Sequence, residues 1–105
     1  MNKIDLSIAT AVYNEEKNVD ELYRRLKKVI DSLKLSYEIV IADDGSSDNT
    51  QEKLLEIRKD DKNIKILSLS RNFGQQPALT AALDHTVGET VVLMDSDLQD
   101  APEFI

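Results

Sequence analysis

The sequence predicts an α/β protein with a Rossmann-like, mostly parallel sheet and helices on both faces of that sheet. Short apolar runs rich in β-branched residues alternate along the chain with segments whose apolar residues recur at helical spacing. The apolar runs contain few polar residues, which is typical of strands covered on both faces. Strands and helices that alternate in this way form parallel sheets through right-handed crossovers.

The first half of the chain supplies two expected strands and the helix between them. An apolar run over residues 6–12 ends at the polar segment 13–16. Residues 18–33 place apolar side chains at helical spacing with Lys and Arg between them, which predicts an amphipathic helix. A β-branched run over residues 38–42 then stops at the turn-rich segment 43–48. Both strands are therefore expected to end in polar loops.

The second helix is expected to begin beside Asp48. This aspartate stands three residues before Gln51, which is the spacing of a capping box. The helical pattern continues to Arg58, and an apolar run over residues 64–69 predicts the third strand.

The third helix and the fourth strand complete the predicted alternation. Pro77 is expected at the first position of this helix, where proline is tolerated, and Gly88 near the end of the helix. Residues 90–94 predict the fourth strand, and residues 102–105 resemble the start of one more helix.

The composition indicates one ordered domain without disulfides. The 105 residues are 41% hydrophobic and 31% charged, and a chain of this length buries a single modest core. The net charge of −7 disfavours a nucleic-acid partner. Because no cysteine is present, we expect a cytoplasmic setting and metal sites built from oxygen ligands. No apolar stretch approaches the ~18 residues of a membrane span, so we expect no secretion signal or anchor in this chain.

Polar side chains follow each predicted strand at its carboxyl end, the edge at which open parallel sheets bind ligands. These residues are Tyr13, Asn14, Glu15, Asp43, Asp44, Arg71, Asp95 and Asp97. A solvated loop or a helix cap explains any one of them equally well, but their shared edge favours a binding site.

Asp95 and Asp97 are the strongest candidates for metal ligands. In an extended backbone, carboxylates two residues apart point to the same side and repel unless a cation lies between them. Mg²⁺ or Mn²⁺ suits oxygen ligands and leaves positions for substrate phosphates, and Gln99 offers a further carbonyl oxygen. Neither G-x-G-x-x-G nor G-x-x-x-x-G-K-[ST] occurs, so a metal is expected to hold phosphates in place of a glycine-rich loop.

Three motifs, in this order and at these strand ends, resemble those of the family-2 glycosyltransferases. They are Tyr13-Asn14-Glu15-Glu16, Asp43-Asp44-Gly45-Ser46-Ser47-Asp48 and Asp95-Ser96-Asp97. The resemblance covers essentially the whole chain and implies a GT-A fold, of which residues 1–105 would be the part that binds the nucleotide sugar. At position 11, where these proteins often have Pro, this chain has Ala11, which leaves the following loop less rigid.

Two further segments resemble the branch of that family that transfers sugars to polyprenyl phosphates such as dolichyl and undecaprenyl phosphate. They are Arg71-Asn72-Phe73-Gly74 and Asp95-Ser96-Asp97-Leu98-Gln99-Asp100, the latter followed by Pro102-Glu103. A cytoplasmic enzyme, or one at the cytoplasmic face of the membrane through a downstream segment, is the corresponding expectation.

The resemblance implies roles for the residues that match its motifs. Tyr13 and Glu15 would belong to the nucleotide pocket, and Asp44 would contact the base. Asp43 would lie in the same pocket or serve as a structural partner. Asp97 would be the catalytic residue and would bind Mg²⁺ or Mn²⁺. Asp95 and Gln99 would complete the shell around the metal and the sugar diphosphate.

The implied reaction is an inverting displacement on a UDP- or GDP-sugar. The acceptor attacks the anomeric carbon, and the metal stabilises the charge that grows on the leaving diphosphate. A polyprenyl phosphate is already anionic and needs little help from a general base. Arg71 is a candidate for binding an anionic group, with a structural salt bridge as the alternative.

Three other interpretations remain open. A receiver domain also uses paired aspartates and Mg²⁺. Its acidic pair follows the first strand, whereas Asp43 and Asp44 follow the second predicted strand of this chain. In a phosphatase of the haloacid-dehalogenase type, Asp-x-Asp opens the domain, whereas Asp95-Ser96-Asp97 nearly closes this chain. A non-catalytic nucleotide-binding fragment is the third, because the family's acceptor half lies downstream of Asp-x-Asp. We therefore expect this chain alone to be inactive or nearly so, and its uncovered apolar surface to favour homo-oligomers.

Overall fold

Strands and helices alternate along residues 3–95, the part of the chain that the computed structural model describes, with only the backbone described for Asp95. The elements are β1 (Leu6–Val12), α1 (Val19–Leu33), β2 (Tyr37–Asp43), α2 (Thr50–Asp60), β3 (Ile64–Ser68), α3 (Gln75–Asp84) and β4 (Thr90–Asp95). The predicted alternation is confirmed, and every predicted strand lies within two residues of its expected bounds. The predicted helix at residues 102–105 lies outside the described residues.

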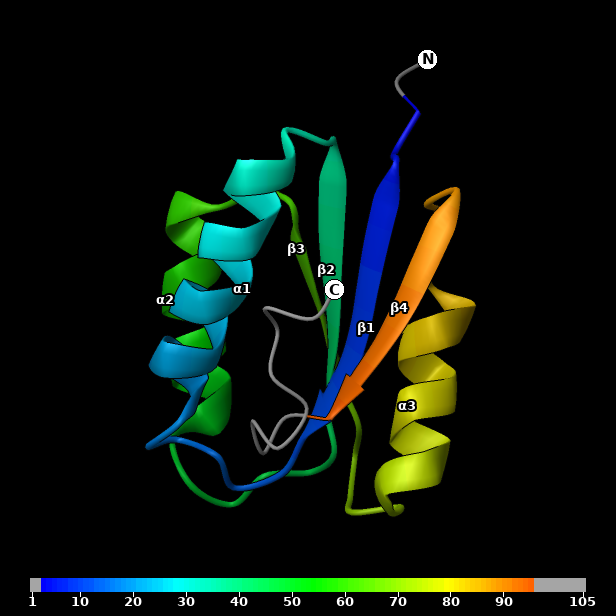
Figure 1. Ribbon diagram of the computed structural model, residues 1–105. Coiled ribbons are helices and arrows are strands. Elements are labelled where there is room, and N and C mark those ends of the chain that lie inside the picture. Colours follow the sequence, from blue (N-terminus) through cyan, green and yellow to red (C-terminus); the bar gives the residue numbers. More distant parts are fainter. Residues whose placement is uncertain (1–2, 96–105) are drawn as a thin grey trace.

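The four strands form one parallel sheet in the order β3-β2-β1-β4. The chain moves from β1 to β2 to β3 in one direction and then returns across the sheet to β4. Because each crossover is right-handed, the reversal places α1 and α2 on one face and α3 on the other (Figure 1). The predicted fold class, with helices on both faces of a parallel sheet, is confirmed.

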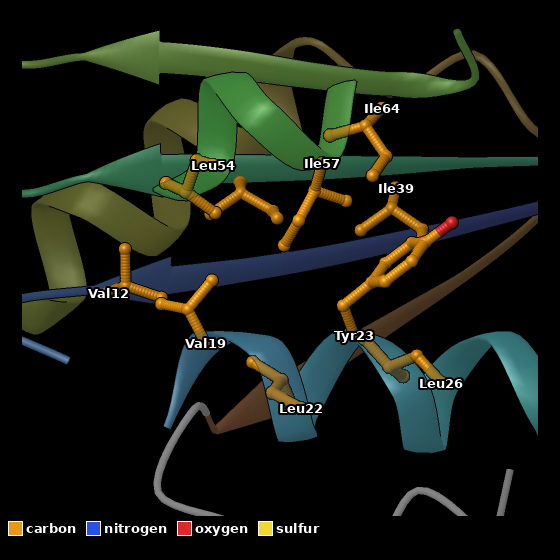
Figure 2. A pocket seen from close by; sticks show the side chains of 10 residues that line it. Val12, Val19, Leu22, Tyr23, Leu26, Ile39, Leu54, Ile57 and Ile64 are labelled. Atoms are coloured by element: carbon orange, nitrogen blue, oxygen red, sulfur yellow. The ribbon is translucent and has the colours of Figure 1, made fainter. Parts of the chain in front are cut away.

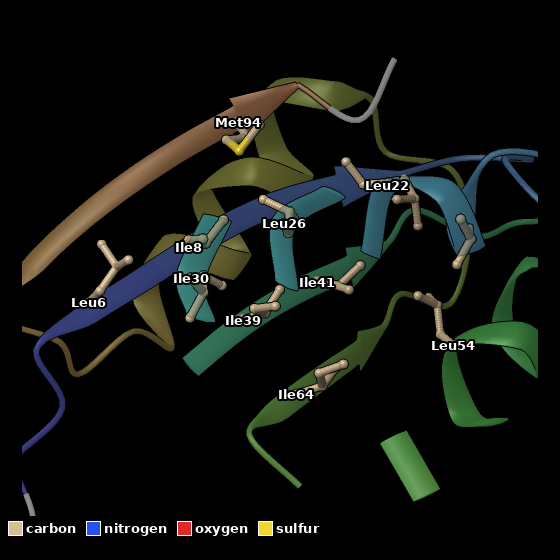
Figure 3. Close-up of a cluster of buried hydrophobic side chains, with 12 residues drawn as sticks. Leu6, Ile8, Leu22, Leu26, Ile30, Ile39, Ile41, Leu54, Ile64 and Met94 are labelled. Carbon is tan, nitrogen blue, oxygen red and sulfur yellow. The ribbon is translucent and has the colours of Figure 1, made fainter. Parts of the chain in front are cut away.

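Large aliphatic side chains fill the face of the sheet beneath α1 and α2 (Figure 3). They belong to β1, α1, β2, α2, β3 and β4, and the buried members are Leu6, Ile8, Val12, Val19, Leu22, Leu26, Ile30, Ile39, Ile41, Leu54, Ile64 and Met94. Each such side chain contributes about 1.5–3 kcal/mol when it leaves water. This layer holds the amphipathic helix α1 in place.

The opposite face of the sheet is lined by small side chains. Ala9, Ala11, Val40 and Ala42 of β1 and β2 contact Ala78 and Ala82 of α3. With alanine on both sides, the backbone of α3 can approach the sheet closely. This helix packs mainly on the two central strands, so part of β4 stays uncovered on this side.

A small apolar cavity of about 10 Å³ lies between α1, α2 and the sheet (Figure 2). Its walls come from residues such as Leu22, Leu54 and Ile57. A space of this size is about that of one water molecule, and a water needs polar partners that these walls lack. The cavity therefore belongs to the core and does not serve as a ligand pocket.

The capping-box prediction at Asp48 is wrong. Helix α2 begins at Thr50, and the residue before it, Asn49, makes no side-chain capping bond. Asp48 Oδ1 instead accepts the N–H and the hydroxyl of Thr50. Asp48 therefore lies one residue before the cap position. Its other oxygen, Oδ2, accepts the N–H of Glu16 from the loop after β1.

Both boundaries expected for α3 are also displaced. The helix begins at Gln75, so Pro77 is its third residue, where its missing N–H is still one that no carbonyl of the helix would accept. The helix ends at Asp84, before Gly88. A Cβ at Gly88 would lie 2.4 Å from Ser7 Oγ and 2.7 Å from Ser7 N, so glycine is needed for close packing against β1.

A buried glutamate holds this turn at the amino edge of the sheet. Glu38 Oε2 accepts the Ser7 hydroxyl at 2.5 Å and the N–H of Val87 at 2.6 Å, and Lys65 Nζ lies 2.7 Å from Oε1. Burial would raise the pKa of Glu38, but Lys65 and these donors outweigh burial and lower that pKa. The carboxylate therefore ties the start of β4 to the three other strands.

A second buried carboxylate joins both α1 and β2 to the segment that precedes β3. Asp61 Oδ2 accepts the hydroxyls of Tyr23 (2.7 Å) and Tyr37 (2.6 Å), and Oδ1 accepts the N–H of Asn63 (3.0 Å). Burial would raise the pKa of Asp61, but the hydroxyl donors lower that pKa below its ordinary value. Burial, aided by Asp61, raises the pKa of both tyrosines, so they remain donors.

Replacement of Asp61 by alanine should destabilise the fold, because two partly buried hydroxyls lose their acceptor. We expect Asp61→Ala to lower the free energy of unfolding at pH 7 by about 2 kcal/mol in urea denaturation. The folded-state pKa of Asp61 lies below its unfolded value, so its contribution is present above about pH 4 and is lost on further acidification. The difference between wild type and variant should therefore shrink below that pH.

Asp60→Ala is the matched control for this prediction, since Asp60 is an exposed neighbour at the end of α2. It should leave the free energy of unfolding within about 0.5 kcal/mol of wild type. Equal effects of the two substitutions would contradict a specific role for Asp61.

Candidate functional site

The carboxyl ends of β1 and β4 meet where the strand order reverses. Ala11 of β1 pairs with Asp95, the last residue of β4, and Val12 pairs with Asp43 of β2. Open α/β sheets bind their ligands in the crevice beyond such a reversal, where the connections diverge to opposite faces. Tyr13 directly follows β1, so Tyr13 and Asp95 flank this position.

The loop after β1 and the loop after β2 are joined by hydrogen bonds. Backbone N–H groups of the first loop donate to side-chain oxygens of the second loop and of Thr50, the first residue of α2. Asn14 donates to Ser46 Oγ (2.9 Å), Glu15 to Thr50 Oγ1 (2.8 Å) and Glu16 to Asp48 Oδ2 (3.4 Å). In the opposite direction, Asn14 Oδ1 accepts the N–H groups of Ser47 (2.8 Å) and Asp48 (3.4 Å). These contacts, called the loop interlock below, account for several polar residues of the two motifs.

Asp48 lies at the centre of the loop interlock. Burial would raise the pKa of its carboxyl, but hydrogen bonds from the hydroxyl and N–H of Thr50 and from the N–H of Glu16 outweigh burial and lower that pKa. Asp48 is therefore ionised at neutral pH and acts as a structural acceptor.

The two aspartates that end β2 are almost fully buried, with exposed fractions of 2% for Asp43 and 3% for Asp44. Asp43 Oδ1 accepts the N–H of Ser46 at 3.1 Å and closes the turn that follows β2. The Asp44 carboxylate accepts the N–H of Phe73 at 2.8 Å and that of Gly74 at 3.1 Å. Asp44 thus connects the loop after β2 to the loop after β3. A carboxylate that accepts two N–H groups still has further lone pairs. Contact between Asp44 and the base of a nucleotide stays a prediction.

Gly45 packs directly against the loop after β3. A Cβ at this position would lie 2.4 Å from the carbonyl carbon of Arg71 and 2.6 Å from the nitrogen of Asn72. Gly45 also has a φ of +72°, which disfavours other residues. The sequence motif therefore contains glycine for two steric reasons.

Arg71 lies over the ring of Phe73, with its guanidinium carbon 4.6 Å from the ring centroid. Both side chains are exposed. The structural salt bridge considered for Arg71 is absent among the described residues. Stacking on an aromatic ring stabilises a cation and restricts where it points, so Arg71 presents a positive charge at the rim of this edge.

The structure brings four of the predicted site residues to one edge. Tyr13 is 46% exposed and makes no hydrogen bond within residues 3–95. The Glu15 carboxylate accepts the side-chain amide of Asn18 at 2.9 Å, beside the start of α1. Asp43 ends the neighbouring strand β2, and Asp44 directly follows it.

The remaining predicted site residues cannot be located in the same way. Asp95 is placed only by its backbone at the end of β4, and Asp97 and Gln99 lie outside the described residues. Within residues 3–95, no group of three His, Cys, Asp or Glu side chains is arranged to hold a metal ion. The predicted metal site therefore rests on the sequence. None of the described helices is both long and apolar enough to span a membrane.

Several residues that shape this edge were not predicted from the sequence as contacts. Asn14, Ser46 and Thr50 form the loop interlock, and the N–H groups of Phe73 and Gly74 bind Asp44. The available signal was small polar residues at matching distances after two neighbouring strands. Such a signal gives proximity, whereas the donor and acceptor pairs depend on the local backbone.

Comparison with known proteins supports the fold and identifies the family. The family model described as glycosyl transferase family 2 matches residues 7–105. An uncharacterized glycosyltransferase of Synechocystis, sll0501, is 46% identical over 102 residues, and the match covers 97% of this chain and 32% of that protein. The uncharacterized glycosyltransferase YkcC of Bacillus subtilis is 47% identical with the same coverage. The chain therefore spans about a third of the length of these relatives.

Solved structures show the same arrangement of strands and helices. The S. aureus protein TarS, residues 1–349, superposes with a TM-score of 0.74 at 31% identity, covering 97% of this chain and 32% of that one. TarS has also been solved with UDP-GlcNAc. The mannosyltransferase PcManGT of Pyrobaculum calidifontis, solved with GDP-Man and Mn²⁺, has a TM-score of 0.67 at 24% identity and covers 92% of this chain and 28% of that one.

The family match extends over almost all of the chain, from residue 7 to residue 105. The expected GT-A fold is confirmed by the superposition on TarS. This chain belongs to glycosyl transferase family 2.

Proposed function

We propose that residues 1–105 form the nucleotide-sugar-binding part of an enzyme that transfers a sugar from a UDP- or GDP-sugar to an acceptor. The observation that carries this proposal is the meeting of Tyr13, the loop interlock and the end of β4 at the reversal of strand order. That edge combines the exposed ring of Tyr13 with the buried carboxylates of Asp43 and Asp44. Membership of the family and the UDP-GlcNAc complex of TarS support a nucleotide-sugar ligand.

Tyr13 and Asp44 are suited to different parts of a nucleotide. The exposed ring of Tyr13 can stack on a base, and Asp44 can accept a base N–H with a lone pair that Phe73 and Gly74 leave free. Asp43 keeps the turn between them closed. Glu15, which accepts a hydrogen bond from Asn18, would belong to the same pocket.

We propose that Asp95, Asp97 and Gln99 hold Mg²⁺ or Mn²⁺, with Asp97 as the catalytic ligand. The carboxylates near the end of β2 are already bonded to N–H groups, which leaves the exit of β4 as the place for a cation at this edge. The Mn²⁺ and GDP-Man complex of PcManGT is an example of such a combination in a protein of the same fold. A bound divalent ion would neutralise charge on the leaving diphosphate.

The acceptor that we propose is a polyprenyl phosphate, and the reaction would invert the configuration of the anomeric carbon. This rests on the segments Arg71–Gly74 and Asp95–Asp100 and on the exposed cation of Arg71, which forms no ion pair within the described part of the chain. Because a phosphate acceptor is already ionised, the demand on the protein is positioning and not proton removal. We place such an enzyme in the cytoplasm or at the cytoplasmic face of the membrane.

Calorimetric titration of UDP- and GDP-sugars into the chain tests the donor site. We expect binding in the presence of Mn²⁺ and a loss of at least about tenfold in affinity when Mn²⁺ is omitted or when Asp97 is replaced by alanine. Asp84→Ala is the control, since Asp84 is an exposed aspartate at the other end of α3 and should bind like wild type. Metal-independent binding, or full affinity in Asp97→Ala, would refute the proposed metal role.

We also propose that the chain self-associates through β4. Among the described residues this strand forms one edge of the sheet, and Leu93 and Val91 are 53% and 37% exposed on the face that α3 leaves partly uncovered. Unpaired strand edges beside apolar side chains favour pairing with another copy.

Sedimentation velocity over a range of protein concentrations tests self-association. Leu93→Ser should shift the protein toward monomer, because it removes the largest exposed apolar side chain on β4. Leu55→Ser, at a similarly exposed leucine on α2, is the control and should sediment like wild type. A wild-type monomer at every concentration would contradict the proposal.

A further inference from the structure

We infer that Asn14 is a positioning residue that holds Tyr13 in place for the nucleotide. The inference rests on the proposed function, because it assigns the purpose of the loop interlock to the ligand pocket. Asn14 makes more contacts between the two loops than any other residue of the interlock, through both its backbone and its side chain.

The backbone of Asn14 turns the chain away from the direction of β1. Its φ is +51°, in the left-handed region that most residues avoid and that Asn adopts several-fold more readily. Val12 is buried at the end of the strand, whereas Tyr13 is the first exposed residue beyond it. The left-handed conformation of Asn14 therefore determines the direction of the backbone that follows Tyr13.

The side chain of Asn14 then fixes this turn to the neighbouring loop. Oδ1 accepts the N–H of Ser47 at 2.8 Å, with longer contacts of 3.4 Å to the Ser47 hydroxyl and the N–H of Asp48. The N–H of Asn14 donates to Ser46 Oγ at 2.9 Å. All the donors to the side chain reach Oδ1, so an isosteric carboxylate could replace the amide.

Tyr13 depends on these contacts because its own hydroxyl makes no hydrogen bond within residues 3–95. Its two neighbours in the chain are both bound to the loop after β2: the N–H of Asp44 donates to Val12 O at 2.8 Å, and Asn14 makes the bonds described above. The position of the ring thus depends on the backbone on either side of it. On one side this backbone is held by a main-chain bond of Val12, and on the other by the side chain of Asn14.

Asn14 is exposed and lies outside both hydrophobic clusters. Its loss should therefore affect the ligand pocket more than the global stability of the fold. This separates a positioning role from a purely structural one.

The test compares Asn14→Gly with Asn14→Asp by calorimetric titration of UDP and of GDP with Mn²⁺. Glycine keeps the left-handed backbone but lacks the acceptor, so we expect affinity to fall about tenfold. Aspartate keeps the acceptor and should bind within about threefold of wild type. Asn49→Gly is the control, because Asn49 is an exposed neighbour without a side-chain bond, and it should match wild type.

A double-mutant cycle with Tyr13→Ala identifies the route of the effect. If Asn14 acts through Tyr13, Asn14→Gly should cause no further loss of affinity in the Tyr13→Ala background. Thermal unfolding of each variant should give midpoints close to wild type. Additive losses in the cycle, or failure of Asn14→Asp to restore affinity, would overturn the positioning role.

The same experiment separates failure of this inference from failure of the proposed function. Wild-type affinity in Asn14→Gly, with UDP or GDP still bound by the wild-type chain, would overturn the role of Asn14 alone. If the wild-type chain binds neither UDP nor GDP, the proposed function is overturned, and the inference with it.

Discussion

The hydrogen-bond register of β1 with its two neighbours determines how the rest of this edge is built. Val12 lies opposite Asp43, and Ala11 lies opposite Asp95, so three strands end at nearly the same level. A shift of one residue in either pairing would turn every side chain of a strand to the other face and place Ile8 against α3. The large residues on one face and alanines on the other exclude that shift. Because the register is fixed, the loops begin side by side and can bond to each other.

Four acidic residues within the described part of this chain are buried and act as acceptors inside the fold. Glu38 and Asp61 at the amino edge receive hydroxyl and N–H donors, and Asp43 and Asp44 at the carboxyl edge receive backbone N–H groups. A buried carboxylate is stable only with such donors. Part of the strongly acidic composition is therefore structural.

The order of elements could be predicted from the sequence because the apolar patterns of β1, β2 and α1 are strong and local. The start of α3 could not be predicted, because Pro77 is tolerated anywhere in the first helical turn. Its end could not be predicted from Gly88, because glycine is required there by close packing against Ser7 and does not mark the end of a helix. For the site, topology alone brings Tyr13 and Asp44 to one edge. The loop interlock depends on a left-handed residue at Asn14 and on exact strand register, which no local pattern encodes.

The close approach of Gly45 to the backbone of Arg71 has a consequence for engineering. The loops after β2 and β3 touch through main-chain atoms, and Asp44 bonds the same partner loop. Neither loop can be exchanged or lengthened near this contact without moving the other. Transplanting a different ligand preference onto this scaffold would therefore require both loops to be grafted together as one matched unit, with β2 as their common anchor.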